Sequence, residues 1–490
     1  MRETTPSPRQ VITGPAWPLH GIVATRALES AALATTPPHA LMQRAGLACA
    51  RLAMALAPHA RTVWVAAGPG NNGGDGMEAA MHLRQWGRDV VVSCLGDPAQ
   101  APADANASRQ RALQAGVRFS DHVPPAWDLC IDALLGIGAT RPPQGAMALW
   151  VTAMRDHDAP VLAIDNPTGL DADTGQAAEV CVQARATLCL LTLKPGLFTA
   201  DGRDMAGQVW LDDLQVKNTA ASDAGAATAH LVGRPEPSRR RHASHKGSYG
   251  DVAIVGGAPG MGGAALLAAS ACLHAGAGRV YLCPLDPLAE SVVPTQAELM
   301  LRDIRTLAVE HMTVVCGCGG GDAVREFLPR MLSRARALVL DADALNAMAT
   351  DSQLQLQLES RSRRDVSTVL TPHPLEAARL LATSAREVQA DRLAAARCLA
   401  KRYRCTVILK GSGTIVASPE GPVAINPTGN GLLASAGTGD VLAGLIGARL
   451  AAGLPPFEAA CAAVYQHGDI ADRWPADTAL TAAALADALR

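Results

Sequence analysis

Short apolar runs alternate with helical patterns along both halves of this chain, and this alternation constrains the fold more than any other feature of the sequence. The runs have the length of buried strands, and the segments between them repeat apolar residues at helical spacing. Strands linked by helices form a parallel sheet that the helices cover on both faces. We therefore predict strands at residues 62–67, 90–94, 129–135, 161–164, 252–255, 279–283, 312–315, 337–340, 367–370 and 406–409.

The length of the chain, 490 residues, is too great for one hydrophobic core. We predict two α/β domains at residues 21–217 and 246–490, preceded by a disordered start at residues 1–20. The linker between them is expected at residues 218–245, where the alternation stops and small polar residues dominate. The arginines at 239–241 could reach a nucleotide phosphate, but a solvated charged run is the better interpretation.

The composition argues against several classes of function. The formal net charge is −2 and only four Tyr and four Phe are present, so nucleic acid is not an expected partner. No apolar run is long enough to cross a membrane and the first residues lack a signal-peptide core, so we expect a cytoplasmic protein. The twelve cysteines form no C-x-x-C pair, and Cys316 and Cys318 are the only close pair. We interpret them as small buried residues rather than metal ligands or disulfides.

Polar residues gather in three loops that follow predicted strands of the first half, at residues 68–76, 132–142 and 165–175. The first loop is expected to lead into a helix that ends near Trp86. Ligands of parallel sheets bind at the carboxyl ends of the strands, so we expect the three loops to form a shared site. Any one acid in them could instead be an ordinary turn residue.

The first loop contains a G-x-G-x-x-G pattern at residues 68–73, for which a dinucleotide-binding turn is the obvious interpretation. Asn71, Asn72 and Asp75 argue against it, because Asp75 would meet the pyrophosphate. A loop rich in carbonyl and carboxylate oxygens suits a hard cation better.

Four motifs of the first half resemble the NAD(P)H-hydrate epimerase family over about residues 20–215. They are Asn-Asn-Gly-Gly-Asp-Gly at 71–76, Asp-Ala-Leu-Leu-Gly at 132–136, Pro-Thr-Gly-Leu-Asp-Ala-Asp-Thr-Gly at 167–175 and Lys-Pro-Gly-Leu at 194–197. The resemblance implies a Rossmann-like three-layer domain.

The same resemblance implies the residues of a site. A potassium ion would be bound by Asn72, Asp132 and Thr168, and Asp165 would be the catalytic acid or base. The hydrated nucleotide would contact Asn71, Asn72, Gly73, Gly74, Asp75, Gly136, Ile137, Gly138, Ala139, Thr140, Arg141, Pro142 and Asp165.

A glycine-rich turn at residues 256–264 follows the first predicted strand of the second half. It is not a P-loop, because no Lys with Ser or Thr follows it. Its glycines allow close approach of a ligand or of a neighbouring helix, and packing alone could explain them. Polar loops at 341–346, 371–374 and 410–414 also follow predicted strands and are expected at the same edge.

A Gly-Thr-Gly-Asp sequence at residues 437–440 precedes an apolar helical pattern. The backbone N–H groups and dipole at the start of a helix favour an anion. A carboxylate beside a phosphate is repelled, so Asp440 makes sense as a base that acts on a hydroxyl receiving a phosphoryl group. The ordinary alternative is that Asp440 is only the N-cap of the helix.

The second half resembles the ribokinase-like fold, and within it the ADP-dependent NAD(P)H-hydrate dehydratase family, from about Lys246 to the C-terminus. The motifs are Leu-Thr-Pro-His-Pro at 370–374, Lys-Gly-Ser-Gly-Thr at 410–414, Asn-Pro-Thr-Gly-Asn at 426–430 and Ala-Gly-Thr-Gly-Asp at 436–440.

This second resemblance implies two sets of ligand contacts. AMP or ADP would contact Lys410, Gly411, Ser412, Gly413, Thr414 and Gly439. The hydrate would contact Ala264, Gly319, His373 and Asp440. For His373 and Lys410 the ordinary alternatives are a structural histidine and a solvated lysine.

Together the two resemblances imply metabolite repair, in which Asp440 is the base for phosphorylation of the hydrate and Asp165 serves epimerisation. We expect potassium in the first domain and ADP, with Mg²⁺, as co-substrate in the second. We also expect a homo-oligomer that acts on small molecules, without nucleic-acid or membrane partners. Two rivals remain: a vitamin kinase that releases a phosphorylated product, and a first half that binds without catalysis.

Overall fold

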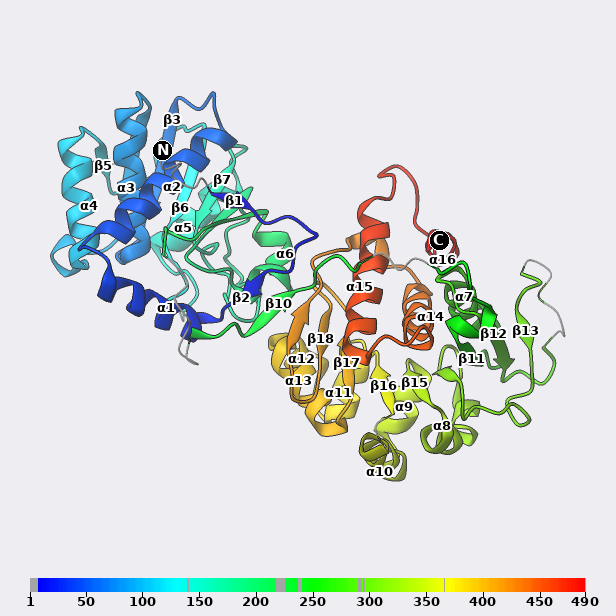
Figure 1. The fold of residues 1–490 in the computed structure, drawn as a ribbon. Coiled ribbons are helices and arrows are strands. Elements are labelled where there is room, and N and C mark those ends of the chain that lie inside the picture. Colours follow the sequence, from blue (N-terminus) through cyan, green and yellow to red (C-terminus); the bar gives the residue numbers. More distant parts are fainter. Residues whose placement is uncertain are drawn as a thin grey trace. The chain divides into compact units, whose positions relative to one another are not determined.

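The computed structural model describes residues 8–138, 141–216, 225–236, 240–289, 293, 296–364 and 366–489. These residues form two compact units (Figure 1). The first unit comprises residues 17–229 with the described residues up to Ile12, and the second comprises 13–16 and 230 onward. Each unit is described separately below.

The first unit is built on one sheet whose strands are parallel except for β1 at one edge. Its spatial order is β1 (Arg9–Gln10), β9 (Gln208–Asp212), β8 (Ala186–Leu190), β7 (Val161–Ile164), β6 (Leu129–Ala133), β3 (Thr62–Ala67), β4 (Asp89–Cys94) and β5 (Arg118–Ser120). A further short strand, β2, spans Pro18–Leu19.

The faces of this sheet are covered by two separate apolar clusters. On β3, Val63 and Val65 pack into one cluster, whereas Trp64 contributes to the other. This alternation follows from the two-residue period of a strand. The helices are α1 (Ile22–Thr35), α2 (Ala40–Leu56), α3 (Asn71–Gln85), α4 (Ala103–Gln114), α5 (Ala146–Arg155) and α6 (Gly202–Met205). Helices α2, α3 and α4 supply the first cluster and α5 the second.

The second unit, coloured from green to red in Figure 1, is built on a larger sheet. Its strands are β13 (Met300–Leu301), β12 (Arg279–Pro284), β11 (Asp251–Gly256), β14 (Thr313–Cys316), β15 (Ala337–Leu340), β16 (Ser367–Leu370), β17 (Thr406–Leu409), β18 (Ile415–Ala417), β19 (Val423–Ile425) and β10 (Ala229–Leu231), in spatial order. Strands β13 to β17 run parallel, and β17, β18 and β19 form an antiparallel meander.

Helices of the second unit pack on this sheet and on one another. They are α7 (Gly262–His274), α8 (Leu328–Arg334), α9 (Asp343–Ala349), α10 (Ser352–Arg361), α11 (Pro374–Leu381), α12 (Ala385–Ala390), α13 (Arg392–Tyr403), α14 (Thr438–Ala451), α15 (Pro456–Asp472) and α16 (Ala482–Asp487). Helices α7, α14, α15 and α16 share one apolar cluster with β11 and β14 to β17. A Cβ on Gly444 would lie 2.0 Å from the carbonyl oxygen of Ala268, so glycine allows α14 to lie against α7.

These topologies confirm the predicted fold class of two α/β domains. Strands β3, β7, β15, β16 and β17 have the predicted bounds. Most of their residues are apolar, because both faces of a parallel sheet are buried. Among the described residues, no helix is both long enough and apolar enough to cross a membrane.

The start of α3 differs from the prediction. Asn71 is the first residue of the helix, so the motif expected as a loop forms its first turns. Close packing explains the glycines there: a Cβ on Gly73 would lie 2.1 Å from the carbonyl oxygen of Gly68, and one on Gly76 would lie 2.5 Å from Cβ of Ala133. The glycines therefore allow helical backbone to lie directly against strand ends.

Two predicted segments contain structure that the sequence pattern did not indicate. Within residues 1–20, β1 pairs antiparallel with β9, and β2 is formed as well; residues 1–7 lie outside the described part. Within residues 218–245, β10 pairs with β19, whereas 218–224 and 237–239 lie outside the described part. Arg240 and Arg241 are exposed, and Arg240 packs over the ring of Tyr249. The domain boundaries themselves remain predictions.

Candidate functional sites in the two units

In the first unit, a wholly buried aspartate lies at the carboxyl end of β6. The Oδ2 atom of Asp132 accepts from the backbone N–H of Thr168 at 2.8 Å, and Oδ1 accepts from Oγ1 of Thr168 at 2.8 Å. Burial raises the pKa of Asp132 to about 6, although the hydrogen bonds from Thr168 and Leu134 act in the opposite direction. A cation beside this carboxyl group would offset the cost of its burial.

A second aspartate, Asp165, follows β7 in left-handed backbone conformation, with a φ of 68°. Its carboxylate forms an ion pair with the ammonium of Lys194, which is wholly buried. The same ammonium donates to the carbonyl oxygens of Leu190 and Thr192, each at 3.0 Å. The buried lysine therefore has three acceptors, and it fixes the position of Asp165.

Gly136 lies close to both Asn72, a predicted ligand of the ion, and Asp165, the predicted acid or base. A Cβ at this position would lie 3.3 Å from Oδ1 of Asn72 and 3.4 Å from Oδ2 of Asp165. The Nδ2 atom of Asn72 is buried and has no hydrogen-bond partner among the described residues. The amide group of Asn72 is thus available to a ligand at the start of α3.

Further acids surround this site. Burial, together with the charges of Asp165 and Glu29, raises the pKa of Asp75 well above its ordinary value. Burial and the charge of Asp165 likewise raise the pKa of Glu29, a residue of α1 that the sequence reasoning missed. The site therefore concentrates acidic groups, whose charged forms burial and mutual repulsion disfavour.

The predicted contacts of the hydrated nucleotide at residues 137–142 are more exposed than Asp132 and Asp165, or lie outside the described residues. Arg141 and Pro142 are exposed, Ile137 is half-buried, and Ala139 and Thr140 lie outside the described residues. A Cβ on Gly138 would lie 2.9 Å from Nη2 of Arg26, a second residue of α1 that was not predicted.

In the second unit, the carboxyl ends of the parallel strands carry a network of charged side chains. Nζ of Lys410, after β17, lies 2.7 Å from Oδ1 of Asp341, after β15. It lies 4.0 Å from Oε2 of Glu376 in α11. Burial acts to lower the pKa of Lys410, but the two carboxylates outweigh it and the pKa is raised. The loops that begin at Asp341 and at Lys410 therefore lie at the same edge of the sheet, as predicted.

Asp440 is in the first turn of α14, but it does not cap the helix. The N-cap is Gly437, with a φ of 88°, and no side chain accepts a cap hydrogen bond there. Burial and the charge of Asp341 raise the pKa of Asp440 to about 6, against a hydrogen bond with Cys318 and the charge of Lys410. The ordinary alternative, a helix cap, is therefore wrong.

His373, a predicted contact of the hydrate, is the N-cap of α11. Its Nδ1 accepts from the backbone N–H groups of Leu375 and Glu376, at 3.1 and 3.3 Å. Its Nε2 lies 3.2 Å from Oε1 of Glu376, whose pKa burial raises to about 7. Burial and the charge of Lys410 lower the pKa of His373. His373 thus serves the helix cap and also lies beside the charged network.

The remaining predicted contacts of the second site surround this network. A Cβ on Gly439 would lie 3.4 Å from Nζ of Lys410, and one on Gly319 would lie 2.9 Å from Cβ of Ala264. The segment 411–414 forms the turn between β17 and β18, where Oγ1 of Thr414 donates to the carbonyl oxygen of Gly411. The glycines leave the approach to Lys410 open.

Two family models match these units. The description of one is NAD(P)H-hydrate dehydratase, and it matches residues 252–490. The other, YjeF-related protein N-terminus, matches residues 38–196. The bifunctional NAD(P)H-hydrate repair enzyme of Escherichia coli is 35% identical over 449 residues, covering 88% of this chain and 84% of that protein. The chain belongs to this family of bifunctional repair enzymes.

A second bifunctional relative and one solved structure are also similar to this chain. The bifunctional NAD(P)H-hydrate repair enzyme of Leishmania braziliensis is 37% identical, covering 88% of this chain and 84% of that protein. Among solved structures, an ADP/ATP-dependent NAD(P)H-hydrate dehydratase from Bacillus subtilis, co-crystallised with ATP/Mg²⁺, is 31% identical. The similar region covers 51% of this chain and 91% of the Bacillus subtilis chain, with a TM-score of 0.45.

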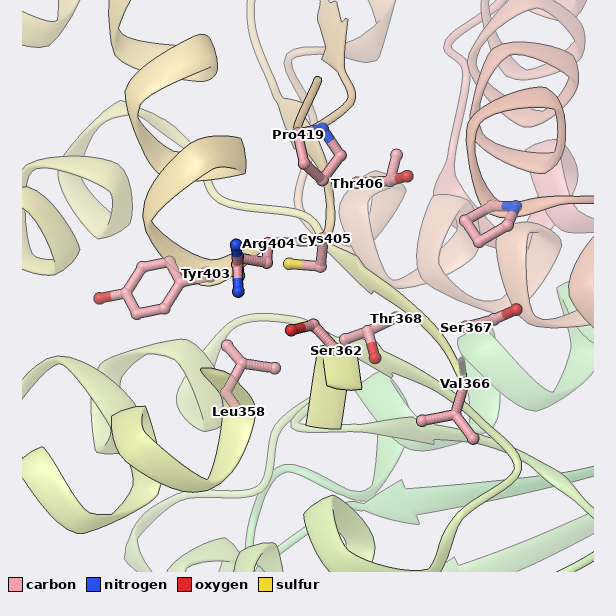
Figure 2. A pocket seen from close by; sticks show the side chains of 11 residues that line it. Leu358, Ser362, Val366, Ser367, Thr368, Tyr403, Arg404, Cys405, Thr406 and Pro419 are labelled. Atoms are coloured by element: carbon pink, nitrogen blue, oxygen red, sulfur yellow. The ribbon is translucent and has the colours of Figure 1, made fainter. Parts of the chain in front are cut away.

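A small cavity of about 170 Å³ lies away from the charged network of the second unit (Figure 2). It opens at the amino ends of β16 and β17, whereas Asp341 and Lys410 follow the carboxyl ends of β15 and β17. Its lining residues include Ser362, Thr368 and Cys405. None of the predicted site residues lines it.

Three side chains to which the sequence reasoning gave no role in a site take part in the two networks: Lys194 and Asp341, which lie in segments that it quoted, and Glu376, which it did not mention. Each could have been suspected, because each is a charged residue at or near the carboxyl end of an apolar strand. Their partners, however, come from other strands and helices.

Proposed function

We propose that this chain restores NADH and NADPH from their hydrated forms: the second unit dehydrates the S hydrate with ADP, and the first interconverts the R and S epimers. Membership of the repair-enzyme family supports this proposal. The observation that carries it is Asp440, a half-buried carboxyl group with a pKa of about 6 beside Lys410 and Gly439. A carboxylate whose pKa is close to neutral pH can act as a base, and an adjacent ammonium can bind phosphate, so the pair suits phosphoryl transfer to a hydroxyl.

In the dehydration, Asp440 takes the proton of the hydroxyl at C6 of the hydrated ring while that oxygen attacks the terminal phosphorus of ADP. The bond from phosphorus to the bridging oxygen breaks and AMP leaves. The oxygen of C6 is now bonded to phosphorus; the C6–O bond then breaks with release of phosphate, a proton leaves C5, and the C5–C6 double bond returns. Lys410 would neutralise phosphate charge during the transfer.

Nucleotide binding would rest on Lys410, the turn 411–414 and Gly439. The ammonium of Lys410 is already oriented by Asp341 and is charged, so it can donate to a phosphate oxygen. Mg²⁺ would arrive on the phosphates, and Asp341 and Glu376 are the carboxylates next to Lys410. Because Gly439 has no side chain, a phosphate could approach the start of α14 closely.

In the first unit, Asp165 would move a proton to or from the hydrated ring while Lys194 holds its carboxylate in place. Potassium would be held by Asn72, Asp132 and Thr168. An amide, a hydroxyl and one carboxylate suit a hard monovalent cation better than a transition metal. The fit rests on the buried carboxyl group of Asp132, whose pKa is raised, and on the amide oxygen of Asn72, which faces Gly136 near Asp165. When bound, the ion would supply positive charge near the substrate.

The proposal is tested by mixing the purified protein with a mixture of hydrated NADH epimers and ADP. We expect the absorbance of the dihydronicotinamide ring to return completely, with one AMP and one phosphate released for each NADH. Without ADP the absorbance should not return. A stable phosphorylated product would instead favour the vitamin kinase, and conversion that stops when one epimer is consumed would mean that the first unit does not epimerise.

A further inference from the structure

A buried arginine lies against the turn that begins at Lys410. Arg392 is only 1% exposed, and its Nη2 atom donates to the carbonyl oxygens of Leu409 and Lys410, at 3.4 and 3.2 Å. Its Nη1 atom donates to Oε1 of Gln389 in α12. The guanidinium therefore bonds the backbone at the carboxyl end of β17, where the turn to β18 begins.

The local sequence explains why this side chain can lie so close to the turn. Asp391, the N-cap of α13, accepts from the backbone N–H of Ala394 at 2.8 Å, and Arg392 is the first residue of that helix. Gly411, in the turn, has a φ of 130°, which favours glycine. A Cβ there would lie 2.9 Å from Nη1 and 3.0 Å from Nη2 of Arg392. Because Gly411 has no side chain, the guanidinium packs directly on the backbone of the turn.

The two carbonyl bonds also set the direction of the peptide N–H groups. The peptide bonds are trans, so each N–H points away from the C=O of the same peptide. The carbonyl oxygen of Leu409 points to Arg392, and the N–H of Lys410 donates instead to the carbonyl oxygen of Pro372 at 2.9 Å. The carbonyl oxygen of Lys410 also points to Arg392, so the N–H of Gly411 points away from it. Gly411 is exposed, and no backbone acceptor among the described residues takes this N–H, so it can donate to a ligand.

Arg392 keeps its charge in this position. Burial lowers its pKa to about 10, which is still well above neutral pH. A cation behind the turn adds positive potential where the phosphates of a nucleotide would lie, beside the ammonium of Lys410. Lys410 would contact a phosphate directly, whereas the turn covers Arg392, which can act only through the backbone and by charge.

We propose that Arg392 is a positioning residue of the nucleotide site: it holds the turn at residues 410–411 so that the N–H of Gly411 faces a phosphate of ADP. This inference rests on the nucleotide site proposed above. The structural alternative is that Arg392 only ties α12 and α13 to the end of β17, without an effect on the nucleotide.

A second buried arginine of the same unit provides a matched control. Arg361 is wholly buried, and burial lowers its pKa to about 10 as well. It donates to Oγ1 of Thr368 and to the carbonyl oxygens of Leu332 and Ser367, at 2.8, 3.1 and 3.2 Å. Ser367 is the first residue of β16, whereas Arg392 bonds the last residue of β17. Because β16 and β17 are parallel, the two arginines lie at opposite ends of the sheet.

The test measures the dissociation constant of ADP by calorimetry, and the KM values of dehydration, for the wild type, Arg392→Met, Arg392→Lys and Arg361→Met. Both methionine variants lose a buried charge and its carbonyl bonds, so both should unfold at a lower temperature. Only Arg392→Met should weaken ADP binding, by about tenfold, the contribution of one hydrogen bond to a charged phosphate. Its KM for ADP should rise in parallel, while its KM for the hydrate stays unchanged. Arg392→Lys keeps the charge and a donor, so it should bind ADP more tightly than Arg392→Met.

Hydrogen exchange gives a readout that needs neither nucleotide nor catalysis. The peptide that spans residues 409–414 should exchange faster in Arg392→Met than in the wild type, and at the wild-type rate in Arg361→Met. Unchanged exchange of this peptide in Arg392→Met would overturn the inference. Equal ADP affinity in the two methionine variants would overturn it as well.

Two further outcomes are separated by the design. If Arg392→Met does not fold, Arg392→Lys and Arg361→Lys are compared in the same way, and equal ADP affinity again overturns the inference. If the wild type itself does not bind ADP, the proposed function fails and this inference fails with it. Binding by the wild type with equal affinity in the paired variants overturns the role of Arg392 alone.

Discussion

Nζ of Lys410 lies 2.7 Å from Oδ1 of Asp341, a carboxylate that also accepts from Oγ1 of Thr371 at 2.7 Å. Asp341 is only 2% exposed, so its charge has little contact with water. The ion pair fixes the ammonium before a nucleotide arrives, and a phosphate would add a second anion beside it. Preorganisation of this kind lowers the cost of ordering a side chain on binding.

Lys410→Ala should weaken ADP binding by at least about tenfold, because a charge-assisted hydrogen bond to a phosphate contributes about 1.5–3 kcal/mol. It also leaves the carboxylate of Asp341 without its ammonium, so the second unit should unfold at a lower temperature. Titration calorimetry measures the first effect. Lys401→Ala, an exposed lysine of α13, is the control. Unchanged ADP affinity in Lys410→Ala would remove Lys410 from the binding site.

Asp440→Asn should fold and bind ADP but lose dehydration by about a hundred-fold to ten-thousand-fold, the contribution typical of a general base. Asparagine keeps the size of the side chain and the position in α14. The same protein should still interconvert the epimers, because that site lies in the other unit. The rate of NADH return measures the effect. Dehydration at the wild-type rate would mean that Asp440 is not the base.

The dehydration rate of the wild type should fall as the pH is lowered through about 6, because protonation of Asp440 removes the base. Glu376, with a pKa of about 7, should gain a proton in the same range and lose its charge beside Lys410. The measurement is kcat between pH 5 and 8 at saturating ADP. A rate independent of pH across this range would contradict the assignment.

Potassium should stabilise the first unit above pH 6 more than below it. Because the folded pKa of Asp132 is raised from 3.8 to about 6, its contribution to the free energy of unfolding falls as the pH rises between these values. A cation bound to the ionised carboxylate offsets that loss, whereas a protonated carboxyl group gains little. Thermal unfolding in potassium and in lithium, at pH 5 and pH 8, measures the difference.

Two variants control the potassium experiment. Asp132→Asn should abolish the advantage of potassium at pH 8. Asp128→Asn changes an exposed carboxylate that precedes β6 and accepts from backbone N–H groups of Arg61 and Thr62, so it should keep the advantage. Equal unfolding temperatures in the two salts at both pH values would count against a potassium site.

Asp165→Asn should convert one epimer of a mixed hydrate pool and then stop, because dehydration resides in the second unit. Lys194 keeps its two carbonyl acceptors in this variant, so the first unit should remain folded. Chromatography that separates the epimers gives the fraction left unconverted. Complete conversion, at the rate of the wild type, would exclude Asp165 as the acid or base of epimerisation.

The two α/β units and most of the central strands could be predicted from the amino-acid sequence alone. Residues 62–67 and 337–340 could be predicted to the residue, since parallel strands buried on both faces are continuous apolar runs. It also indicated Asp165, Lys410 and Asp440, because glycine and polar residues interrupt an apolar pattern only at strand ends and helix starts.

Which of these groups contact one another depends on the packing of the strands and helices. The pairing of Lys194 with Asp165, and of Lys410 with Asp341, joins residues from different strand ends that no local pattern connects. The helical start at Asn71 depends on the contact of Gly73 with Gly68 and of Gly76 with Ala133. The raised pKa of Asp440 likewise comes from burial and from a neighbouring charge, and both exist only once the sheet and its helices have packed.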